Sequence, residues 1–327
     1  MLIAVNAETD AIARAADALA AGELVAFPTE TVYGLGARAD DDTAVAKIFA
    51  AKGRPSEHPL IVHLVEAADS ARFTSALPPV AQRLMDSFWP GPLTLIVPRR
   101  PDIASAAAGG QSTIGLRCPS HPVARALLSA ARERGVPGVA APSANRFGRI
   151  SPTRAQHVAE EFGDALMVLD GGPCEVGIES SIVDCSRGRP VLLRPGVLTR
   201  ALIEAAAGEP LHDADAAAPR ASGTLAAHYA PKARLRLMTA PMISSALQVL
   251  GPAPLKLAVY STALPPVLAP GIRHRLMPRG ADAVARELFS VLRDFDAQGA
   301  QLIWVEEPPA APEWEGVRDR LQRAAAS

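Results

Sequence analysis

The stretch LVAFPTETVYGLG, residues 24–36, decides how the rest of this chain is interpreted. It opens with a short apolar run of the length and composition of a buried strand, which Pro28 ends because proline has no N–H to donate. The polar cluster TETVY (29–33) follows, and two glycines close the stretch. Hydroxyls and a carboxylate after a strand, beside glycines that permit close approach, indicate the floor of a binding site. The alternative is a strand followed by a tight turn that Pro28, Gly34 and Gly36 shape.

Length and composition favour a two-domain protein with a large core. The chain has 327 residues, which is long for one domain, and 49% of them are hydrophobic. A net charge of −1 gives no general attraction to nucleic acid or membranes, although a local basic cleft stays open. The three cysteines include no CxxC pair, so neither a zinc site nor a disulfide framework is indicated. With no leader pattern and no run of about 18 apolar residues, we expect a soluble, cytoplasmic protein without membrane partners.

Hydrophobic periodicity in residues 1–207 predicts helices and strands that alternate irregularly. The predicted helices are 8–21, 42–51, 80–88, 123–134, 153–162 and 199–207. The predicted strands are 24–27, 60–65, 93–97, 114–118, 139–141 and 166–169, with a hairpin of 181–185 and 191–193. This pattern predicts an α/β (α+β) domain with a mixed sheet and helices packed on it.

The periodic pattern stops at residue 208 and resumes after residue 232. Residues 208–232 are predicted to be a linker. The following region, 233–327, contains predicted strands at 235–238, 255–260 and 302–305 and helices at 242–250, 284–295 and 314–325. This order predicts a smaller, Rossmann-like parallel α/β domain. No GxGxxG motif opens a helix there, so a dinucleotide role is not supported.

Polar clusters that follow predicted elements are the candidates for chemistry. They are Lys52 with Arg54, Arg117, Ser143 with Asn145, Ser180 with Ser181, and Arg194. Any one of them alone is more often a surface charge or a turn residue than a ligand contact. Four cations among mostly apolar neighbours instead favour a phosphate or carboxylate ligand, because Arg can bind either group in a forked geometry.

Several other kinds of site are disfavoured by the sequence. The chain lacks the GxxxxGK[ST] phosphate loop, the GxSxG elbow and the HExxH motif. His58, His63 and Glu66 would need a helix to act together as metal ligands, yet their segment is predicted to be a strand. We therefore expect no metal held by protein side chains alone.

Taken together, the motifs resemble those of the threonylcarbamoyl-AMP synthase family, which has the YrdC-like fold. They are PTETVYGLG (28–36), AKGRP (51–55), HPLIVHL (58–64), WPGPLT (89–94), STIGLR (112–117), PSAN (142–145), GIESSIVD (177–184) and LRPG (193–196). The stretch GTLAAHYAPK (223–232) and the domain after it resemble the longer, two-domain members. The number and order of these motifs make the resemblance specific.

The resemblance implies a fold and a reaction. Residues 1–207 would form a YrdC-like twisted mixed sheet that makes threonylcarbamoyl-AMP and pyrophosphate from L-threonine, bicarbonate or CO2, and ATP. The product would pass to the machinery that transfers the threonylcarbamoyl group to the tRNA adenosine beside the anticodon. Mg2+ would arrive with ATP and bridge its phosphates. No protein nucleophile is required, so positioning and charge neutralisation would carry catalysis.

The resemblance also implies roles for individual residues. Lys52 and Arg54 would be catalytic. The threonine pocket would comprise Thr31, His63, Arg117, Ser181 and the backbone of Ala141. The residues around ATP would be Lys52, Arg54, His58, Thr113, Ser143, Asn145, Ser151, Arg194 and Tyr229. Tyr229 would fold over the nucleotide as part of a lid formed by residues 208–232. The role of Glu30 is left open.

Two of these residues could have purely structural roles, and two alternative functions stay open at this point. Tyr229 could simply anchor the linker, and His63 could be a satisfied strand histidine. A related carbamoyl-transfer enzyme of hydrogenase maturation would carry paired CxxC zinc modules, which this chain lacks. An RNA-binding module with a cationic concave face is opposed by the near-zero net charge, although weak RNA binding is still compatible with it.

Overall fold

The computed structural model describes residues 2–4, 10–250, 256–263 and 271–327, and for 2–4 only the backbone. It divides into two compact units. The first contains residues 1–147 and 151–224, and the second contains residues 148–150 and 225–327. No helix in the described ranges is long and apolar enough to cross a membrane.

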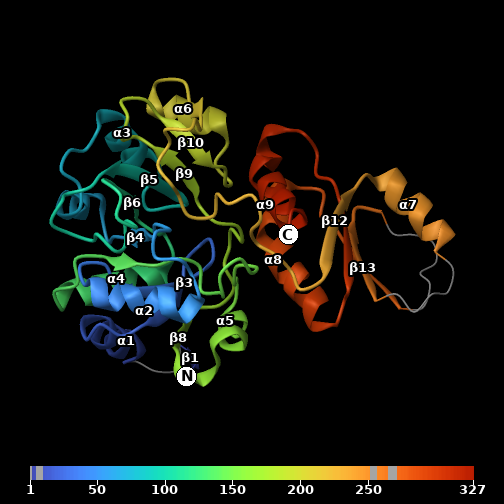
Figure 1. The fold of residues 1–327 in the computed structure, drawn as a ribbon, viewed down its shortest axis with the longest axis horizontal. Coiled ribbons are helices and arrows are strands. Elements are labelled where there is room, and N and C mark those ends of the chain that lie inside the picture. Colours follow the sequence, from blue (N-terminus) through green and yellow to red (C-terminus); the bar gives the residue numbers. More distant parts are fainter. Residues whose placement is uncertain (1, 5–9, 251–255, 264–270) are drawn as a thin grey trace. The chain divides into compact units, whose positions relative to one another are not determined.

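The first unit is a mixed sheet with helices packed on it (Figure 1), as predicted. Its helices are α1 (Ala11–Ala20), α2 (Asp42–Lys52), α3 (Pro79–Phe88), α4 (Pro122–Glu133), α5 (Ala155–Phe162) and α6 (Arg200–Ala207). Its strands are β1 (Leu2–Ala4), β2 (Val25–Pro28), β3 (Tyr33–Arg38), β4 (Ile61–His63), β5 (Leu93–Pro98), β6 (Thr113–Arg117), β7 (Val139–Ala140), β8 (Met167–Asp170), β9 (Ser181–Asp184), β10 (Val191–Arg194) and β11 (His212–Asp213). The strand order is β1-β8-β2-β3-β7-β4-β6-β5-β9-β10-β11.

The opening stretch folds as a hairpin of β2 and β3, which corrects the prediction that Gly34 and Gly36 belong to a turn. Pro28 pairs with Tyr33, so residues 29–32 form the hairpin loop and both glycines lie within β3. A Cβ atom on Gly36 would lie 2.8 Å from Phe27 Cε1 and 2.8 Å from Val139 Cγ1. Glycine is therefore needed here for close packing across the sheet.

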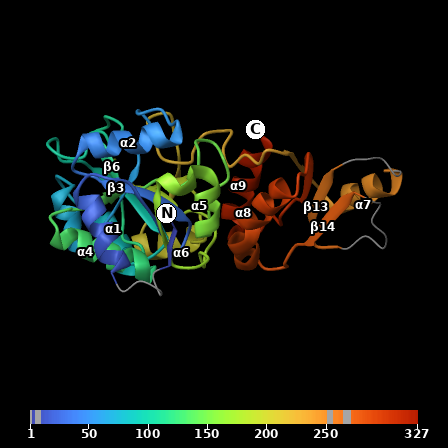
Figure 2. The same ribbon diagram turned by 90° about the horizontal axis from the view of Figure 1, so that it is seen from below.

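The two faces of this sheet are covered differently. One face packs against α2, α3, α5 and α6 in a large apolar core. On the other face, α1 and α4 lie side by side over the part that contains β2, β7 and β8 (Figure 2). Farther along the sheet on that face, β4, β5, β9 and β10 contribute a small apolar cluster instead: Ile61, Ile96 and Ile182 pack with Leu193 and Ala221. The sheet surface next to this cluster is where the candidate site lies.

The end of the first unit contains more structure than predicted. Residues 208–224 were expected to be linker, yet β11 pairs in parallel with β10, with Val191 opposite His212. The predicted hairpin of β9 and β10 is confirmed as an antiparallel pair. A two-residue strand gives no periodic signal, which explains why the sequence did not indicate β11.

Within the described residues, the second unit is a parallel four-stranded sheet with three helices, which confirms the predicted parallel α/β type although only three strands were predicted. Its strands are β12 (Arg234–Met238), β13 (Leu257–Ser261), β14 (Ile272–Leu276) and β15 (Leu302–Glu306), in the order β12-β15-β13-β14. Its helices are α7 (Ala240–Val249), α8 (Ala281–Ala297) and α9 (Glu315–Ala325). Strand β14 was not predicted, because IRHRL alternates charged residues along an edge strand. The predicted starts at residues 8 and 255 lie outside the described residues.

Candidate active site

The candidate site forms where several strands of the first unit end at one edge. His63 is the last residue of β4 and pairs in register with Arg117, the last residue of β6. β5 runs antiparallel to β6 and parallel to β9, and Leu93 at its start pairs with Ser181 at the start of β9. The topology thus brings His63, Arg117 and Ser181 to the same edge of the sheet, although they are far apart in the chain.

Arg117 is the centre of a buried polar network. Its side chain is 4% exposed, and its Nη2 lies 2.7 Å from Glu30 Oε1. Its Nη1 donates to Thr31 Oγ1 at 2.9 Å. The second oxygen of Glu30 accepts a hydrogen bond from the backbone N–H of Ser120 at 3.2 Å. The β2–β3 loop therefore supplies both partners of the guanidinium.

The hydroxyl groups of this loop have a fixed donor order. Thr29 Oγ1 donates to Val32 O at 2.7 Å, which uses its only hydrogen. In the 2.9 Å contact between Thr29 Oγ1 and Thr31 Oγ1, Thr31 is therefore the donor. Since Thr31 also accepts from Arg117, its remaining capacity is one lone pair. Thr31 can accept a hydrogen bond from a ligand but cannot donate one.

Three buried polar atoms at this edge have neither a hydrogen-bond partner nor an ion-pair partner within the described part of the protein. They are Ser181 Oγ, His63 Nδ1 and Arg117 Nε. Buried polar groups are normally satisfied, so three such atoms at one edge of the sheet indicate a polar ligand. All three residues belong to the set predicted for threonine. The backbone N–H of Ala141, also in that set, donates to Ile61 O at 2.9 Å.

His63 is held in the neutral form by its surroundings. Burial, with the nearby positive charge of Arg117, lowers the pKa of His63 to about 3. Its ring lies edge-on to Phe27, with the ring centroids 6.2 Å apart. The neutral imidazole adds no charge to the site, and its Nδ1 is the ring nitrogen that has no partner among the described residues.

A second group of predicted residues lies around the end of α2. Lys52 is buried, and its Nζ donates to Ser143 O at 2.5 Å and to Asn145 O. Burial, followed by the charge of Arg54, lowers the pKa of Lys52 well below its usual value. Asn145 Nδ2 donates to Arg146 O at 2.7 Å. The Lys-x-Arg and Ser-x-Asn motifs are therefore joined by direct hydrogen bonds.

Arg54 and His58 share the ring of Phe147. The guanidinium carbon of Arg54 lies 5.7 Å from the ring centroid, and Arg54 Nη2 donates to Pro59 O at 3.0 Å. The His58 ring meets Phe147 edge-on at 5.4 Å. Burial, with the charge of Arg54, lowers the pKa of His58. Phe147, two positions after Asn145, was not among the predicted site residues.

The remaining predicted side chains of this unit are also placed by buried contacts. Arg194 donates to Ser180 O from both Nε, at 3.1 Å, and Nη2, at 2.9 Å. Ser180 Oγ lies 2.8 Å from Thr94 Oγ1. Ser151 donates to a carboxylate oxygen of Glu179. Arg194 and Ser151 thus flank the segment that leads into Ser181.

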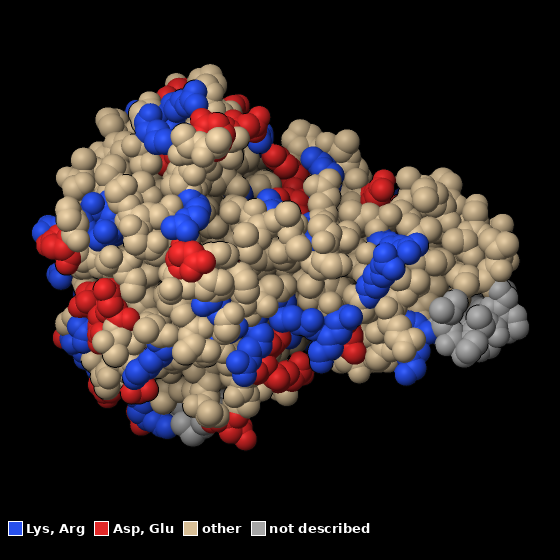
Figure 3. Space-filling view, viewed as in Figure 1, with Lys and Arg blue, Asp and Glu red and all other residues tan. Residues whose placement is uncertain are grey.

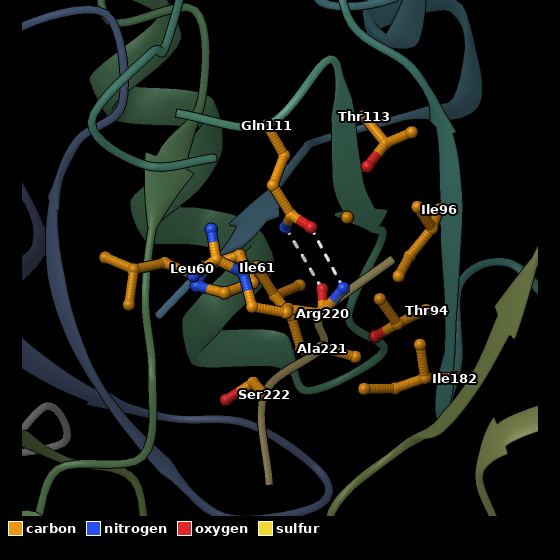
Figure 4. A pocket seen from close by; sticks show the side chains of 12 residues that line it. Leu60, Ile61, Thr94, Ile96, Gln111, Thr113, Ile182, Arg220, Ala221 and Ser222 are labelled. Carbon is orange, nitrogen blue, oxygen red and sulfur yellow. Dashed lines mark hydrogen bonds between the residues drawn. The ribbon is translucent and has the colours of Figure 1, made fainter. Parts of the chain in front are cut away.

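A small hollow lies on the sheet face beside these groups (Figure 4). Thr113, predicted for ATP, lines it together with Thr94 and residues 220–222 of the predicted linker. The Gln111 side-chain amide holds this segment by two hydrogen bonds. Its Nε2 donates to Arg220 O at 3.1 Å, and its Oε1 accepts from Arg220 N at 2.9 Å. Neither Gln111 nor Arg220 was predicted from a sequence motif. The Gln111 amide binds backbone atoms of Arg220, and every residue type except proline has these atoms, so the contact does not require a particular residue at position 220.

Tyr229 belongs to the second unit. Its ring stacks on Phe289, with the centroids 5.4 Å apart, and Arg320 lies 5.3 Å from its centroid. Its φ angle is +62°, in the left-handed region. The predicted placement of Tyr229 over a nucleotide stays a prediction.

Charged side chains on the surface of the first unit are mixed in sign. On the face seen in Figure 3, Lys and Arg lie beside Asp and Glu in small groups. A phosphate groove for RNA would need positive charge gathered along one stripe. The four predicted cations of the site, in contrast, are all buried: Lys52, Arg54, Arg117 and Arg194.

The arrangement suits binding and charge neutralisation. Three arginines and a lysine are fixed by carbonyl, hydroxyl and carboxylate partners, so they need little reorganisation to receive anionic groups. The unpartnered polar atoms of Ser181 and His63 lie at the strand edge with Arg117. Such a site can hold a small polar molecule next to a polyphosphate.

Two family models match the chain. One, described as "Telomere recombination" and covering the Sua5, YciO and YrdC proteins, matches residues 17–196. The other, described as "Threonylcarbamoyl-AMP synthase, C-terminal domain", matches residues 198–326.

Similar proteins extend over nearly the whole chain. A threonylcarbamoyl-AMP synthase of Bacillus subtilis is 40% identical over 330 residues, which is 96% of this chain and 92% of that protein. One of Schizosaccharomyces pombe is 33% identical over 92% of this chain and 84% of that protein. The crystal structure of P. abyssi Sua5 complexed with L-threonine is 35% identical, with a TM-score of 0.89 over 99% of this chain and 97% of that one.

Proposed function

The chain belongs to the threonylcarbamoyl-AMP synthase family, and we propose that it makes threonylcarbamoyl-AMP and pyrophosphate from L-threonine, bicarbonate or CO2, and ATP. The observation that carries this proposal is the set of buried, unpartnered polar atoms among the described residues: Ser181 Oγ, His63 Nδ1 and Arg117 Nε. They lie where the motif match predicts threonine, and the relative from P. abyssi was solved with L-threonine.

Arg117 is the natural partner of the threonine carboxylate. Its Nη1 is bound to Thr31 and its Nη2 to Glu30, so the Nε edge is the one that a carboxylate would meet. Ser181 and neutral His63 would contact the amine or hydroxyl of the substrate. Thr31 would supply its one remaining lone pair to a donor of the substrate.

The chemistry would proceed without a protein nucleophile. The threonine ammonium loses one proton to water and becomes a neutral amine. The amine nitrogen then adds to CO2, which forms an N–C bond and releases a second proton to water, so the product is a carbamate that keeps one N–H. A carbamate oxygen then attacks the α-phosphorus of ATP, and the bond to pyrophosphate breaks. Lys52, Arg54 and Arg194 would neutralise the phosphate charge during this transfer. The Lys52 ammonium group has three N–H donors. Two of them donate to the backbone carbonyls of Ser143 and Asn145, so one is left for a phosphate oxygen.

Mg2+ bound with ATP is part of this proposal. The described residues contain no group of three or more His, Cys, Asp or Glu side chains placed to hold a metal ion. Phosphate oxygens and water would therefore supply most of its ligands, as is usual for Mg2+ at nucleotide sites. Mg2+ would supply charge neutralisation between the phosphates.

We place the reaction before the transfer of the threonylcarbamoyl group to tRNA, by separate machinery. ATP and tRNA both occur in the cytoplasm, which is the compartment that we propose for this step. Residues 208–232 and Tyr229 are proposed to act as the lid over ATP. The two hydrogen bonds between the Gln111 amide and the Arg220 backbone hold residues 220–222 at the hollow, which supports a lid role for them.

The test is the release of pyrophosphate by the purified chain. We expect release only when ATP, L-threonine and bicarbonate are all present. In the double variant Glu30→Gln/Arg117→Met, which removes the buried ion pair as a unit, threonine-dependent release should be lost. The matched control is Arg100→Met, which removes a surface arginine paired with Asp102 and should keep full activity. Pyrophosphate release that ignores threonine would contradict the proposal.

A further inference from the structure

The buried ion pair between Glu30 and Arg117 has a role that its contribution to folding does not explain. Both side chains are almost fully buried, at 6% and 4% exposed, and their charged atoms are 2.7 Å apart. A buried ion pair is often no more stabilising than apolar residues of the same volume, because both charges lose their hydration. Its presence at the edge of the predicted threonine pocket points to a function in binding.

Glu30 fixes the plane of the Arg117 guanidinium. One carboxylate oxygen contacts Nη2, and the other is itself held by the backbone N–H of Ser120 at 3.2 Å. Thr31 Oγ1 holds Nη1 at 2.9 Å. With two of its nitrogens held by protein atoms, the guanidinium directs Nε, which has no partner in the described structure, at the ligand.

Glu30 also sets the net charge of the pocket. Arg117 contributes one positive charge and Glu30 one negative charge, while His63 is neutral because burial lowers its pKa to about 3. The sum for these three groups is zero. A pocket of zero net charge suits a ligand that carries one charge of each sign, whereas an uncompensated arginine would favour a simple anion.

We propose that Glu30 is a specificity-determining residue, which makes the pocket select an α-amino acid zwitterion over a carboxylate that lacks the amine. This inference rests on the proposed function. The carboxylate of the ligand meets Arg117, and its ammonium group is attracted by the negative charge of Glu30 until the amine is converted to the carbamate. Opposite charges within about 6 Å in a partly polar site can change affinity by well over tenfold.

The experiment compares two ligands on the full-length chain by calorimetry. The ligands are L-threonine and 3-hydroxybutyrate, which has the carboxylate and the hydroxyl but no amine. In Glu30→Gln, which keeps the shape but removes the charge, threonine should bind more weakly and 3-hydroxybutyrate more tightly. The ratio of their affinities should fall at least tenfold, while ATP affinity stays within about twofold.

Two further variants separate charge from structure. Glu30→Asp keeps the charge and should keep the ligand ratio within about threefold of the wild type, even if both affinities drop. Glu23→Gln removes an exposed carboxylate paired with Lys47 and should change neither affinity. If the role of Glu30 were purely structural, Glu30→Gln would lower the affinities for L-threonine and 3-hydroxybutyrate by the same factor. An unchanged ratio of the two affinities would therefore overturn the inference.

The wild type keeps the inference testable if Glu30→Gln does not fold. It must bind L-threonine at least tenfold more tightly than 3-hydroxybutyrate, and equal affinities would overturn the role of Glu30. A wild type that binds neither threonine nor its analogue would overturn the proposed function and this inference with it. A wild type that makes pyrophosphate with threonine but does not discriminate between the two ligands would overturn this inference alone.

Discussion

Ser180 and Ser181 are adjacent and both fully buried, but their hydroxyl groups have different surroundings. Ser180 Oγ contacts Thr94 Oγ1 at 2.8 Å and accepts from Arg194 at 3.2 Å, whereas Ser181 Oγ has no partner among the described residues. The Ser180 hydroxyl therefore stabilises the folded protein, whereas the Ser181 hydroxyl is available to a ligand. This contrast gives a prediction for each serine.

We expect Ser181→Ala to weaken threonine binding without reducing stability. Its hydroxyl makes no bond that folding depends on, so the free energy of unfolding should change by less than about 0.5 kcal/mol. Loss of one hydrogen bond to a charged ligand should raise the Kd for threonine about tenfold or more. The matched variant Ser180→Ala should lose about 1–3 kcal/mol, because it leaves buried partners unsatisfied. Urea unfolding and calorimetry check both; equal destabilisation by the two variants would contradict the prediction.

His63 should make the folded protein less stable at acidic pH. Its pKa is about 3 in the folded state and about 6.5 when unfolded, so the unfolded state binds more protons below pH 6.5. The stabilisation is complete above pH 6.5 and is lost as the pH falls from there toward 3. Between pH 7.5 and pH 5.5 the loss from this group should be about 1.4 kcal/mol.

The measurement compares urea unfolding of the wild type and His63→Asn at these two pH values. His58 and His121, whose pKa values burial also lowers, are present in both proteins, so their effects cancel. The variant should lose about 1.4 kcal/mol less than the wild type over this range. The same pH dependence in both would show that His63 is not held neutral.

Candidate residues of the site could be chosen from the sequence where a side-chain type carries the chemistry, and their contact with a substrate stays a prediction. Thr31, His63 and Arg117 stand together as the motifs implied. Glu30 could be seen in the sequence, but its ion pair with Arg117 could not, because 87 positions of chain separate the two. Gln111 gave no signal at all, since it acts on the backbone of Arg220.

At the scale of elements, a glycine fixes the approach of one segment to another. Gly196 follows β10, and a Cβ atom there would lie 2.6 Å from Ser181 N and 2.7 Å from Ser181 Oγ. These atoms belong to a strand start that hydrogen bonds hold, since Ser181 N donates to Pro92 O at 3.0 Å. The start of β9 therefore has its position only because residue 196 has no side chain.

Gly196→Ala should destabilise the first unit and displace Ser181. We expect a loss of about 1–3 kcal/mol from the overpacking, measured by urea unfolding. Gly115→Ala in β6 is the matched control for stability, because its Cβ atom would meet Thr94 Cγ2 at an ordinary 3.5 Å. The control should change stability by less than about 1 kcal/mol. Tolerance of alanine at both positions would show that β10 can move away from β9.

Elements were predicted well where periodicity is long and poorly where they are short or edge-exposed. Helix α2 and the hairpin of β9 and β10 are confirmed close to their predicted bounds. Strand β3 was missed because its glycines suggest a turn, although they allow Phe27 to pack against that strand. Strand β11 has only two residues and depends on its pairing with β10.

At the scale of the whole molecule, each unit has its own core. The first unit packs its helices on the mixed sheet. In the second unit, α7 residues pack on β13 and β15, and α8 buries Leu288 and Phe289 completely. The change in sequence pattern after residue 207 predicted two domains, because each region has enough apolar residues to bury its own apolar face. The exact boundary depends on tertiary contacts, which is why residues 208–224 join the first unit.

Separate cores predict separate unfolding transitions, which a single large-to-small substitution can assign. Leu288 is fully buried in α8, so Leu288→Ala should cost the second unit about 2–5 kcal/mol. Leu116 is equally buried in β6, and Leu116→Ala should cost the first unit a similar amount. In scanning calorimetry each variant should lower one transition and leave the other within about 1 °C, because each substitution removes apolar contacts within one unit. L-threonine should then raise only the transition that Leu116→Ala lowers, since ligand binding stabilises the unit that holds the site. A single transition that shifts as a whole in both variants would mean that the two units unfold as one cooperative body.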